Sequence, residues 1–197
     1  MSQDHVVKFA AALDGVLRSP LIAQQYAELV RELVALRERG GRLFVLGVGG
    51  GAANAAHAVN DLRKLCGIEA YAPTDGIAEL TARANDEGWH TIFVEWLRTS
   101  RLSRRDAIMV FSVGGGQAKV SACLYEAVQF AKWLDAKVLG IVGRADGATA
   151  KMGDAVIVVG PVLDDDSMIT PITETVQIAL LHALVSDPKL QCRRTKW

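Results

Sequence analysis

Two glycine-rich segments are the first part of the sequence with clear chemical potential. Gly47-Val-Gly-Gly-Gly51 and Ser112-Val-Gly-Gly-Gly116 each follow a short apolar run and precede a helical stretch. Glycines let the backbone approach a ligand, and the N-terminus of the following helix offers free N–H groups and a positive dipole end. A single loop of this kind is as well explained by a tight turn. Two in equivalent places favour the binding of an anion such as phosphate.

His57 and Asp61 are a second candidate, four residues apart in the helical stretch after the first loop. Residues at this spacing share one face of a helix. They are either a solvated pair worth a few tenths of a kcal/mol, or a metal site or acid/base pair near the strand ends. Asn54 and Lys64 extend the same stripe, which favours a solvated face. The residues alone leave both interpretations open.

Glu174 and His182 lie in the last helical stretch, eight residues apart. On a helix they point about 80° apart. Their neighbours are apolar, and a histidine in such surroundings is more often a core or interface residue than a ligand. The sequence alone does not link them to His57 and Asp61. Asn85 and Asp86 belong to a predicted helix end and turn, whose side chains could reach a ligand.

Elements of an α/β fold must position these residues. Continuous apolar runs with β-branched residues, separated by helical stretches, predict parallel strands buried on both faces. We expect five strands, at 42–48, 69–72, 107–113, 137–142 and 155–159. The fold class is therefore a doubly wound, five-stranded parallel sheet flanked by helices. Two helices are predicted within residues 4–39, divided at Ser19-Pro20 and ended by Gly40-Gly41, and a final helix over 171–185.

Composition excludes several classes of protein. The 197 residues carry no formal net charge and are 50% hydrophobic, so a sizeable core can form and no basic face for nucleic acid is indicated. The three cysteines form no Cys-x-x-Cys pair, which argues against a cysteine zinc site or redox motif and fits a reducing compartment. We find no signal peptide and no run of about 20 apolar residues. We expect a cytoplasmic protein that binds neither membrane nor nucleic acid.

Four segments resemble those of the phosphoheptose isomerases, which belong to the sugar isomerase (SIS) family. Residues 47–57, GVGGGAANAAH, are similar to their G-N-G-G-S-A-A-x-A-x-H opening, and residues 80–88, LTARANDEG, to L-T-A-x-x-N-D-x-G. Residues 112–117, SVGGGQ, stand where the family has S-T-S-G-N-S. Residues 141–152 are similar to L-T-G-x-x-G-G-x-M. The resemblance covers most of the chain in the right order, including a helical N-terminal extension.

The resemblance implies a function and an assembly. It implies reversible conversion of sedoheptulose 7-phosphate to an aldoheptose 7-phosphate, in a homotetramer with one zinc ion per subunit. The family's two His, Glu and Gln zinc ligands correspond to His57, His182, Asp61 and Glu174. The family also implies that Asp61 and His182 are the acid/base pair. The substrate-binding residues it implies are Gly49, Gly50, Gly51, Asn85, Asp86, Ser112, Val113, Gly114, Gly115, Gln117 and Glu174.

The departures from the family pattern concern two of the metal ligands and the loops that would bind the substrate phosphate. Asp61 is one methylene shorter than the family Glu, and Glu174 replaces a neutral amide, although both can ligate zinc through oxygen. Several loop side chains that could bind phosphate are missing, since Val48, Gly51, Val113, Gly114 and Gln117 replace polar or hydroxyl residues. Only Ser112 keeps its hydroxyl, so we expect the phosphate to depend mainly on backbone N–H groups.

Two other functions are compatible with the sequence. One is a non-catalytic SIS module that senses a phosphosugar or binds protein. The other is a dinucleotide enzyme, because Gly47, Gly49 and Ala52 fit G-x-G-x-x-A, with Glu69 at about the right spacing for the acidic residue. The second glycine loop has no role in that enzyme. We divide the chain into a helical extension, 1–40, and an SIS phosphosugar-binding domain, 41–197.

Overall fold

The predicted apolar runs form one parallel sheet in the computed structural model, which describes residues 2–196. The five strands are β1 (Leu43–Gly47), β2 (Ala70–Tyr71), β3 (Ala107–Ser112), β4 (Lys137–Val142) and β5 (Ala155–Val158). Their order is β2-β1-β3-β4-β5, and every pairing is parallel. The predicted doubly wound fold is confirmed. The order reverses between β1 and β3, which is where open sheets of this type bind ligands.

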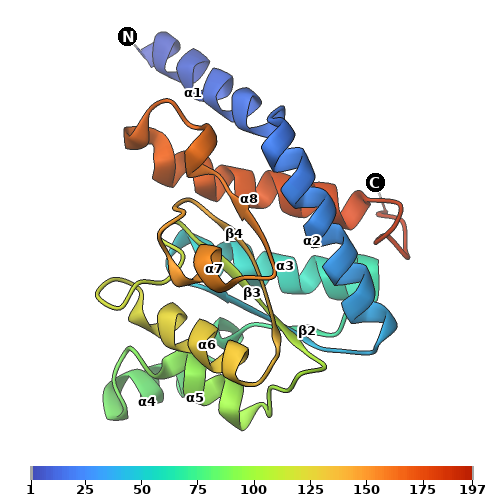
Figure 1. The fold of residues 1–197 in the computed structure, drawn as a ribbon, viewed down its shortest axis with the longest axis vertical. Coiled ribbons are helices and arrows are strands. Elements are labelled where there is room, and N and C mark those ends of the chain that lie inside the picture. The colour runs from blue at the N-terminus through green and yellow to red at the C-terminus, as the bar shows by residue number, and fades with distance from the viewer. Residues whose placement is uncertain (1, 197) are drawn as a thin grey trace.

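Helices cover both faces of the sheet (Figure 1). They are α1 (Ser2–Leu17), α2 (Pro20–Glu38), α3 (Gly50–Cys66), α4 (Ile77–Asp86), α5 (Ile92–Thr99), α6 (Ala122–Trp133), α7 (Ala148–Met152) and α8 (Ile169–Ser186). The helices α2, α3 and α8 share one hydrophobic cluster with the sheet, and α5 and α6 share the other. Both clusters exclude water from the strands, which explains why the strands read as continuous apolar runs.

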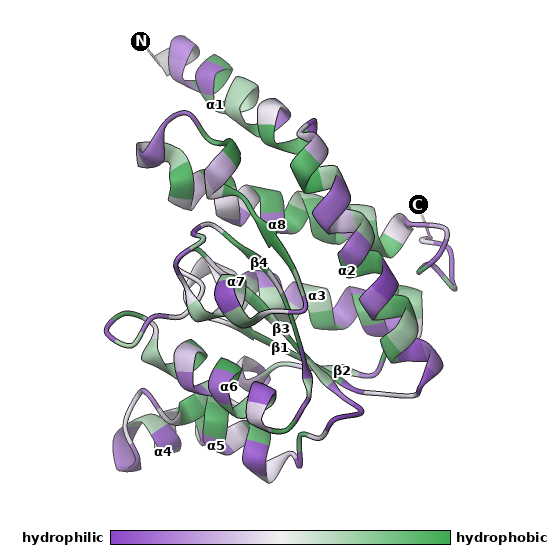
Figure 2. Ribbon diagram, viewed as in Figure 1, coloured by the Kyte–Doolittle hydropathy of each residue, from purple (hydrophilic) through white to green (hydrophobic). Residues whose placement is uncertain are grey.

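Successive strand residues alternate between the two clusters. Val45 and Met109 pack with α2, α3 and α8, whereas Phe44 and Val110 pack with α5 and α6. Figure 2 shows the result as apolar strands enclosed by helices whose outer surfaces are hydrophilic. The register pairs Gly47 with Phe111 and Ser112 with Val142, so the strands that carry the glycine loops end side by side.

The two N-terminal helices separate where the sequence predicts. Ser19 is the extended N-cap residue of α2 and Pro20 its first helical residue. In Figure 1, α1 projects beyond the body of the protein, whereas α2 lies against it. Leu29, Leu33 and Leu36 of α2 are fully buried in the same cluster as the sheet. The region 1–40 therefore contributes to the core.

The helix α8 corrects one expectation from composition. Residues 166–186 are long and apolar enough to cross a membrane by length and composition alone, contrary to our prediction that no such run exists. In its most apolar 18-residue stretch 44% of the residues are buried inside the protein, and the helix packs on α3, β3 and β4. Its apolar residues are those of a core helix, with Ile172, Val176 and Leu181 inaccessible to solvent.

One buried ion pair joins the starts of β1 and β3. The carboxylate of Asp106, 3% exposed, accepts hydrogen bonds from Arg42 Nη2 at 2.8 Å, Arg42 N at 3.0 Å and Ser103 Oγ at 2.9 Å. Burial alone would raise the pKa of Asp106, but the hydrogen bonds from Arg42 and Ser103 hold it below its usual value. The ionised carboxylate therefore stabilises the fold.

Asp106→Asn should destabilise the protein by about 3 kcal/mol at neutral pH, because it leaves Arg42 without its buried partner. A carboxyl whose folded pKa is lowered stabilises above its unfolded pKa, and the contribution is lost as pH falls through the folded pKa. The difference in free energy of unfolding from wild type should thus shrink below about pH 4. Urea unfolding across pH, with the exposed Asp164→Asn as control, measures both effects. A difference that is constant down to pH 2 would contradict this assignment.

The loop after β1 also depends on close backbone packing. A Cβ atom on Gly51 would overlap the backbone carbonyl oxygen of Phe111, on the neighbouring strand β3. A Cβ atom on Gly114, in the loop after β3, would lie in open space. The first glycine loop is thus pressed against β3, which fixes the start of α3.

Gly51→Ala should cost roughly 1–3 kcal/mol of stability, since the strand must shift to admit one methyl group. Gly114→Ala should be tolerated within about 1 kcal/mol, the ordinary Gly–Ala difference. Thermal and urea unfolding of both variants test this pair. Equal stability of the two variants would show that the close approach at Gly51 is not a constraint.

Candidate functional site

The candidate site is built on the parallel helices α3 and α8. Asn54 Nδ2 donates to the backbone oxygen of Glu174 at 3.1 Å and to Gln177 Oε1 at 2.8 Å. Gln177 Nε2 in turn donates to the backbone oxygen of Ile141, on β4, at 3.0 Å. Gln177 is fully buried and Asn54 is 9% exposed, so these groups need one another as partners. Asn54 is therefore a buried bridge between helices, and its predicted place on a solvated stripe was wrong.

This register brings His57 and His182 together. His57 Nε2 lies 3.1 Å from Asp61 Oδ2 and 3.4 Å from His182 Nε2. Ligand atoms of the three residues all lie within 4.8 Å of one another. The side chain of His57 is 42% exposed and that of Asp61 15% exposed, so the cluster lies at the surface without being fully solvated. Side chains from α3 and α8 thus form one cluster, although the sequence alone did not link the two helices.

The spacing of this cluster fits a zinc ion. Two ligand atoms that each lie about 2.0–2.1 Å from zinc at a tetrahedral angle are about 3.3 Å apart. The distances from His57 Nε2 to Asp61 and to His182, 3.1 Å and 3.4 Å, match that separation. Imidazole nitrogen and carboxylate oxygen are also donors that zinc accepts, and three protein ligands leave a fourth position for substrate.

Glu174 lies apart from this cluster. Among the described residues it is not part of the group formed by His57, Asp61 and His182, and its carboxylate packs directly over the Cα atom of Gly50, at the start of α3. There the carboxylate meets the positive end of the helix dipole. A Cβ atom on Gly50 would collide with it, which gives this glycine a structural role.

A cavity of about 510 Å³ opens beside the two glycine loops, at the carboxyl ends of β1, β3 and β4. It is lined by Val48, Gly51, Ser112, Val113, Gly114, Gln117, Val120, Ser121, Arg144, Asp146, Ile169, Thr170, Glu174 and Gln177. Ser112 Oγ accepts a hydrogen bond from Gly115 N at 3.0 Å, which closes the second loop. Within the part of the chain that the structure describes, the amides of Gly114 and Gly116 donate to no protein acceptor. Such free N–H groups suit an anion.

Ser121 is a cavity residue that sequence reasoning missed. It is the N-cap residue of α6, has a positive φ of 59°, and its hydroxyl forms no capping bond. Our prediction ended at Gln117, whose N–H donates to Val120 O at 3.0 Å in a turn before the helix. A serine directly before an apolar helical period is an N-terminal signal, which would have found it.

The other predicted site residues do not all lie at one cavity. Asn85 and Asp86 end α4, hydrogen-bond each other at 2.7 Å, and line neither the glycine-loop cavity nor the cavity beside the cluster. Asp61 and His182 line that second cavity, of about 420 Å³, which is also lined by Thr195 and Lys196. Two groups of residues result, the glycine loops at one end of α3 and α8 and the cluster further along both helices.

Curated relatives resemble this chain over most of its length, although no family model matches it. A phosphoheptose isomerase from Geotalea daltonii is 30% identical over 168 residues, covering 83% of this chain and 82% of the relative. A probable phosphoheptose isomerase from Thermoplasma volcanium is 29% identical over 161 residues, covering 79% and 76%.

Solved structures agree on the fold. The phosphoheptose isomerase from Neisseria gonorrhoeae superposes with a TM-score of 0.78 at 24% identity, over 93% of this chain and 94% of the other. The sequence motifs, the parallel sheet and the identity over more than four fifths of both chains point the same way. The chain belongs to the phosphoheptose isomerase family of SIS-domain proteins.

Proposed function

We propose that the chain is an aldose–ketose isomerase that converts sedoheptulose 7-phosphate to an aldoheptose 7-phosphate. One observation carries the proposal: the cluster of His57, Asp61 and His182 lies on the same two helices whose N-terminal ends border the glycine-loop cavity. The proposal assigns the chemistry and the anion binding to two points along this one pair of helices.

The distance between these points suits an elongated substrate. Gly50 and His57 are seven residues apart on α3, which corresponds to about 10 Å along the helix axis. A phosphate held by the loops after β1 and β3 leaves the other end of a seven-carbon sugar to reach the cluster. The phosphate then serves as a handle whose binding energy orients the reacting carbons.

Isomerisation requires one base and one acid. Asp61 takes the proton from the carbon next to the ketone, and His182 protonates the carbonyl oxygen to give an enediol. Return of a proton to the former carbonyl carbon, with loss of the hydroxyl proton from its neighbour, completes the aldose. Positioned groups of this kind typically contribute about 10²–10⁴-fold to rate.

Zinc is the proposed cofactor, one ion per subunit. His57, Asp61 and His182 would hold it. The resemblance implies Glu174 as a fourth ligand, but in the structure its carboxylate lies against Gly50, so the fourth position is left to substrate. When bound, zinc acts as a Lewis acid that polarises the carbonyl group. A lone pair that binds metal is not free to accept a proton, so the ligand and acid/base roles compete at Asp61 and His182.

We also infer a homotetramer in the cytoplasm. Val6 and Val7, each 67% exposed on the projecting helix α1, offer an apolar surface to a second copy, whereas Phe9 and Leu13 pack against the chain's own core. Three free cysteines, at 66, 123 and 192, are consistent with a reducing compartment.

The zinc-loaded protein should convert sedoheptulose 7-phosphate to an aldoheptose 7-phosphate, followed by NMR, and a chelator should abolish the reaction. Asp61→Asn and His182→Ala should each lower kcat by at least about 100-fold, because each removes a positioned proton-transfer group. His90→Ala, which alters a histidine outside the cluster, is the matched control. Near-normal turnover in either cluster variant would remove that residue from the mechanism.

Binding without turnover is the informative alternative outcome. Wild-type protein that binds the sugar phosphate and zinc but forms no aldose would support a sensing or protein-interaction module. Titration of the dinucleotide NAD tests the remaining alternative, since the proposed function predicts no saturable binding. These outcomes separate the three functions compatible with the sequence.

A further inference from the structure

Arg144 is the one cationic side chain among the described residues that line the glycine-loop cavity. The same cavity contains two acidic side chains, Asp146 and Glu174. A sugar phosphate that enters it brings up to two more negative charges. Backbone N–H groups supply dipoles but no net charge, and the loop hydroxyls are few. Among the described cavity residues, Arg144 is therefore the one side chain that can offset the charge of a phosphate.

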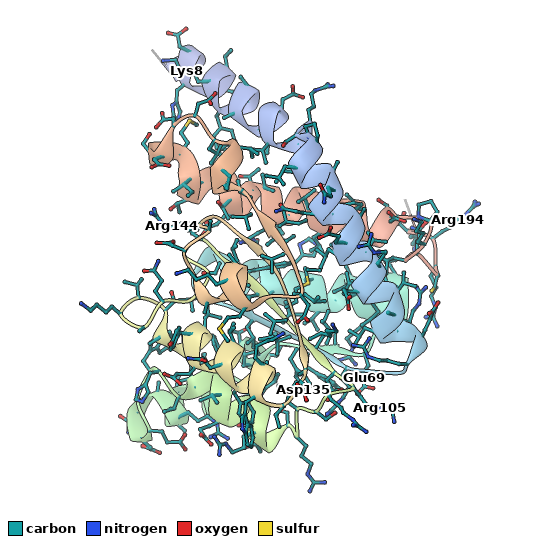
Figure 3. The ribbon with its side chains drawn as sticks, viewed as in Figure 1. Lys8, Glu69, Arg105, Asp135, Arg144 and Arg194 are labelled. Atoms are coloured by element: carbon teal, nitrogen blue, oxygen red, sulfur yellow. The ribbon has the colours of Figure 1, made fainter. Side chains whose placement is uncertain are left out.

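The backbone around Arg144 is tied to the second glycine loop at both ends. Arg144 N donates to Val113 O at 2.9 Å, and Gly143 N to the same oxygen at 3.0 Å. Ala148 N donates to Gly116 O at 2.8 Å, on the far side of the turn. The 143–148 segment is thus held along 113–116, the loop that contributes Val113 and Gly114 to the cavity lining. Figure 3 shows Arg144 on the loop after β4, on the side of the protein where residues 113–121 also lie.

The side chain, unlike its backbone, is held only weakly. Within the described part of the chain it contacts Asp146, two residues away, with Arg144 Nε 3.3 Å from Asp146 Oδ1. The two side chains are 50% and 55% exposed. An exposed pair of this kind contributes about 0–1 kcal/mol. A phosphate offers three oxygens and more charge than the carboxylate, in a geometry that matches the guanidinium.

We propose that Arg144 is the phosphate-recognition residue of this site, and that it exchanges Asp146 for the phosphate of the substrate. This inference rests on the proposed function for the identity of the sugar, but not for the anion. It assigns to one arginine the charge recognition that the loop hydroxyls cannot supply. It also predicts opposite effects for the two members of the pair.

The anion arm of the test uses inorganic phosphate and calorimetric titration. Arg144→Ala should weaken phosphate binding by about 10- to 100-fold, as expected for loss of charge-assisted hydrogen bonds. Asp146→Asn should tighten it by about 2- to 5-fold, because the guanidinium loses a competing partner and the cavity a negative charge. Lys151→Ala, which removes an equal charge from the neighbouring helix α7, should change it less than 2-fold.

The kinetic arm uses sedoheptulose 7-phosphate. Arg144→Ala should raise KM by a similar factor with little change in kcat, because Arg144 binds the end of the substrate remote from the reacting carbons. Arg144→Lys, which keeps the charge without the fork, should recover part of the loss. Circular dichroism and thermal unfolding establish that the variants are folded.

The outcomes separate this inference from the proposed function. Turnover by wild type with KM unchanged in Arg144→Ala would overturn the role of Arg144 and leave the isomerase intact. No turnover by wild type would overturn the isomerase, while the loss of phosphate binding in Arg144→Ala would still support the anion site. Phosphate binding that is absent from wild type, or equal in Arg144→Ala and Lys151→Ala, would overturn the inference.

Discussion

The candidate site depends on the hydrogen bonds made by one buried glutamine. Gln177 accepts from Asn54 on α3 and donates to a backbone oxygen of β4, so one side chain sets α8 against both a helix and the sheet. An unpaired amide at this depth would cost about 1–3 kcal/mol, so a different register between the helices is disfavoured. With the register fixed, His57 and His182 meet one turn further along. The cluster is thus a consequence of a polar contact that touches neither histidine.

The first glycine loop is positioned by a different constraint, namely close contacts that only residues without a side chain allow. Gly51 lies against the backbone of Phe111, and Gly50 admits the carboxylate of Glu174. The family serine has no room at position 51, which gives that departure a physical reason. Anion binding at this end of the helices then shifts from hydroxyl groups to amides and, by our inference, to Arg144. Two short segments of backbone therefore determine which chemical groups the cavity can offer.

Much of the fold could be predicted because buried parallel strands leave a strong pattern. All five strands and the break at Ser19-Pro20 follow from continuous apolar runs and from proline and glycine positions. The polar contacts between helices could not be predicted in this way. An asparagine is compatible with a solvated helix face and with a buried hydrogen-bonded bridge. Only the position of Asn54 opposite Gln177 shows that it forms a buried bridge.

The candidate residues show the same division. The family pattern identified His57, Asp61 and His182, and periodicity placed them on helices, but pairing them required the packing of α3 on α8. Ser121 and Arg144 were missed because they lie on loops that fold back over the cavity. The path of such loops leaves no periodic pattern in the sequence. Glu174 was assigned to the metal site by resemblance. In the structure its carboxylate occupies the space beside Gly50 that a side chain would fill, and this contact could not be predicted from the sequence.

In the proposed function, side chains from two helices, α3 and α8, hold one zinc ion between them. Zinc affinity, measured by competition with a chelating indicator, tests it most directly in His57→Ala, His182→Ala and the control His90→Ala. Each cluster variant should lose more zinc affinity than the roughly 10–100-fold typical of changes around a metal ligand, while the control should bind zinc as wild type does. Wild-type affinity in either cluster variant would mean that α3 and α8 do not share an ion.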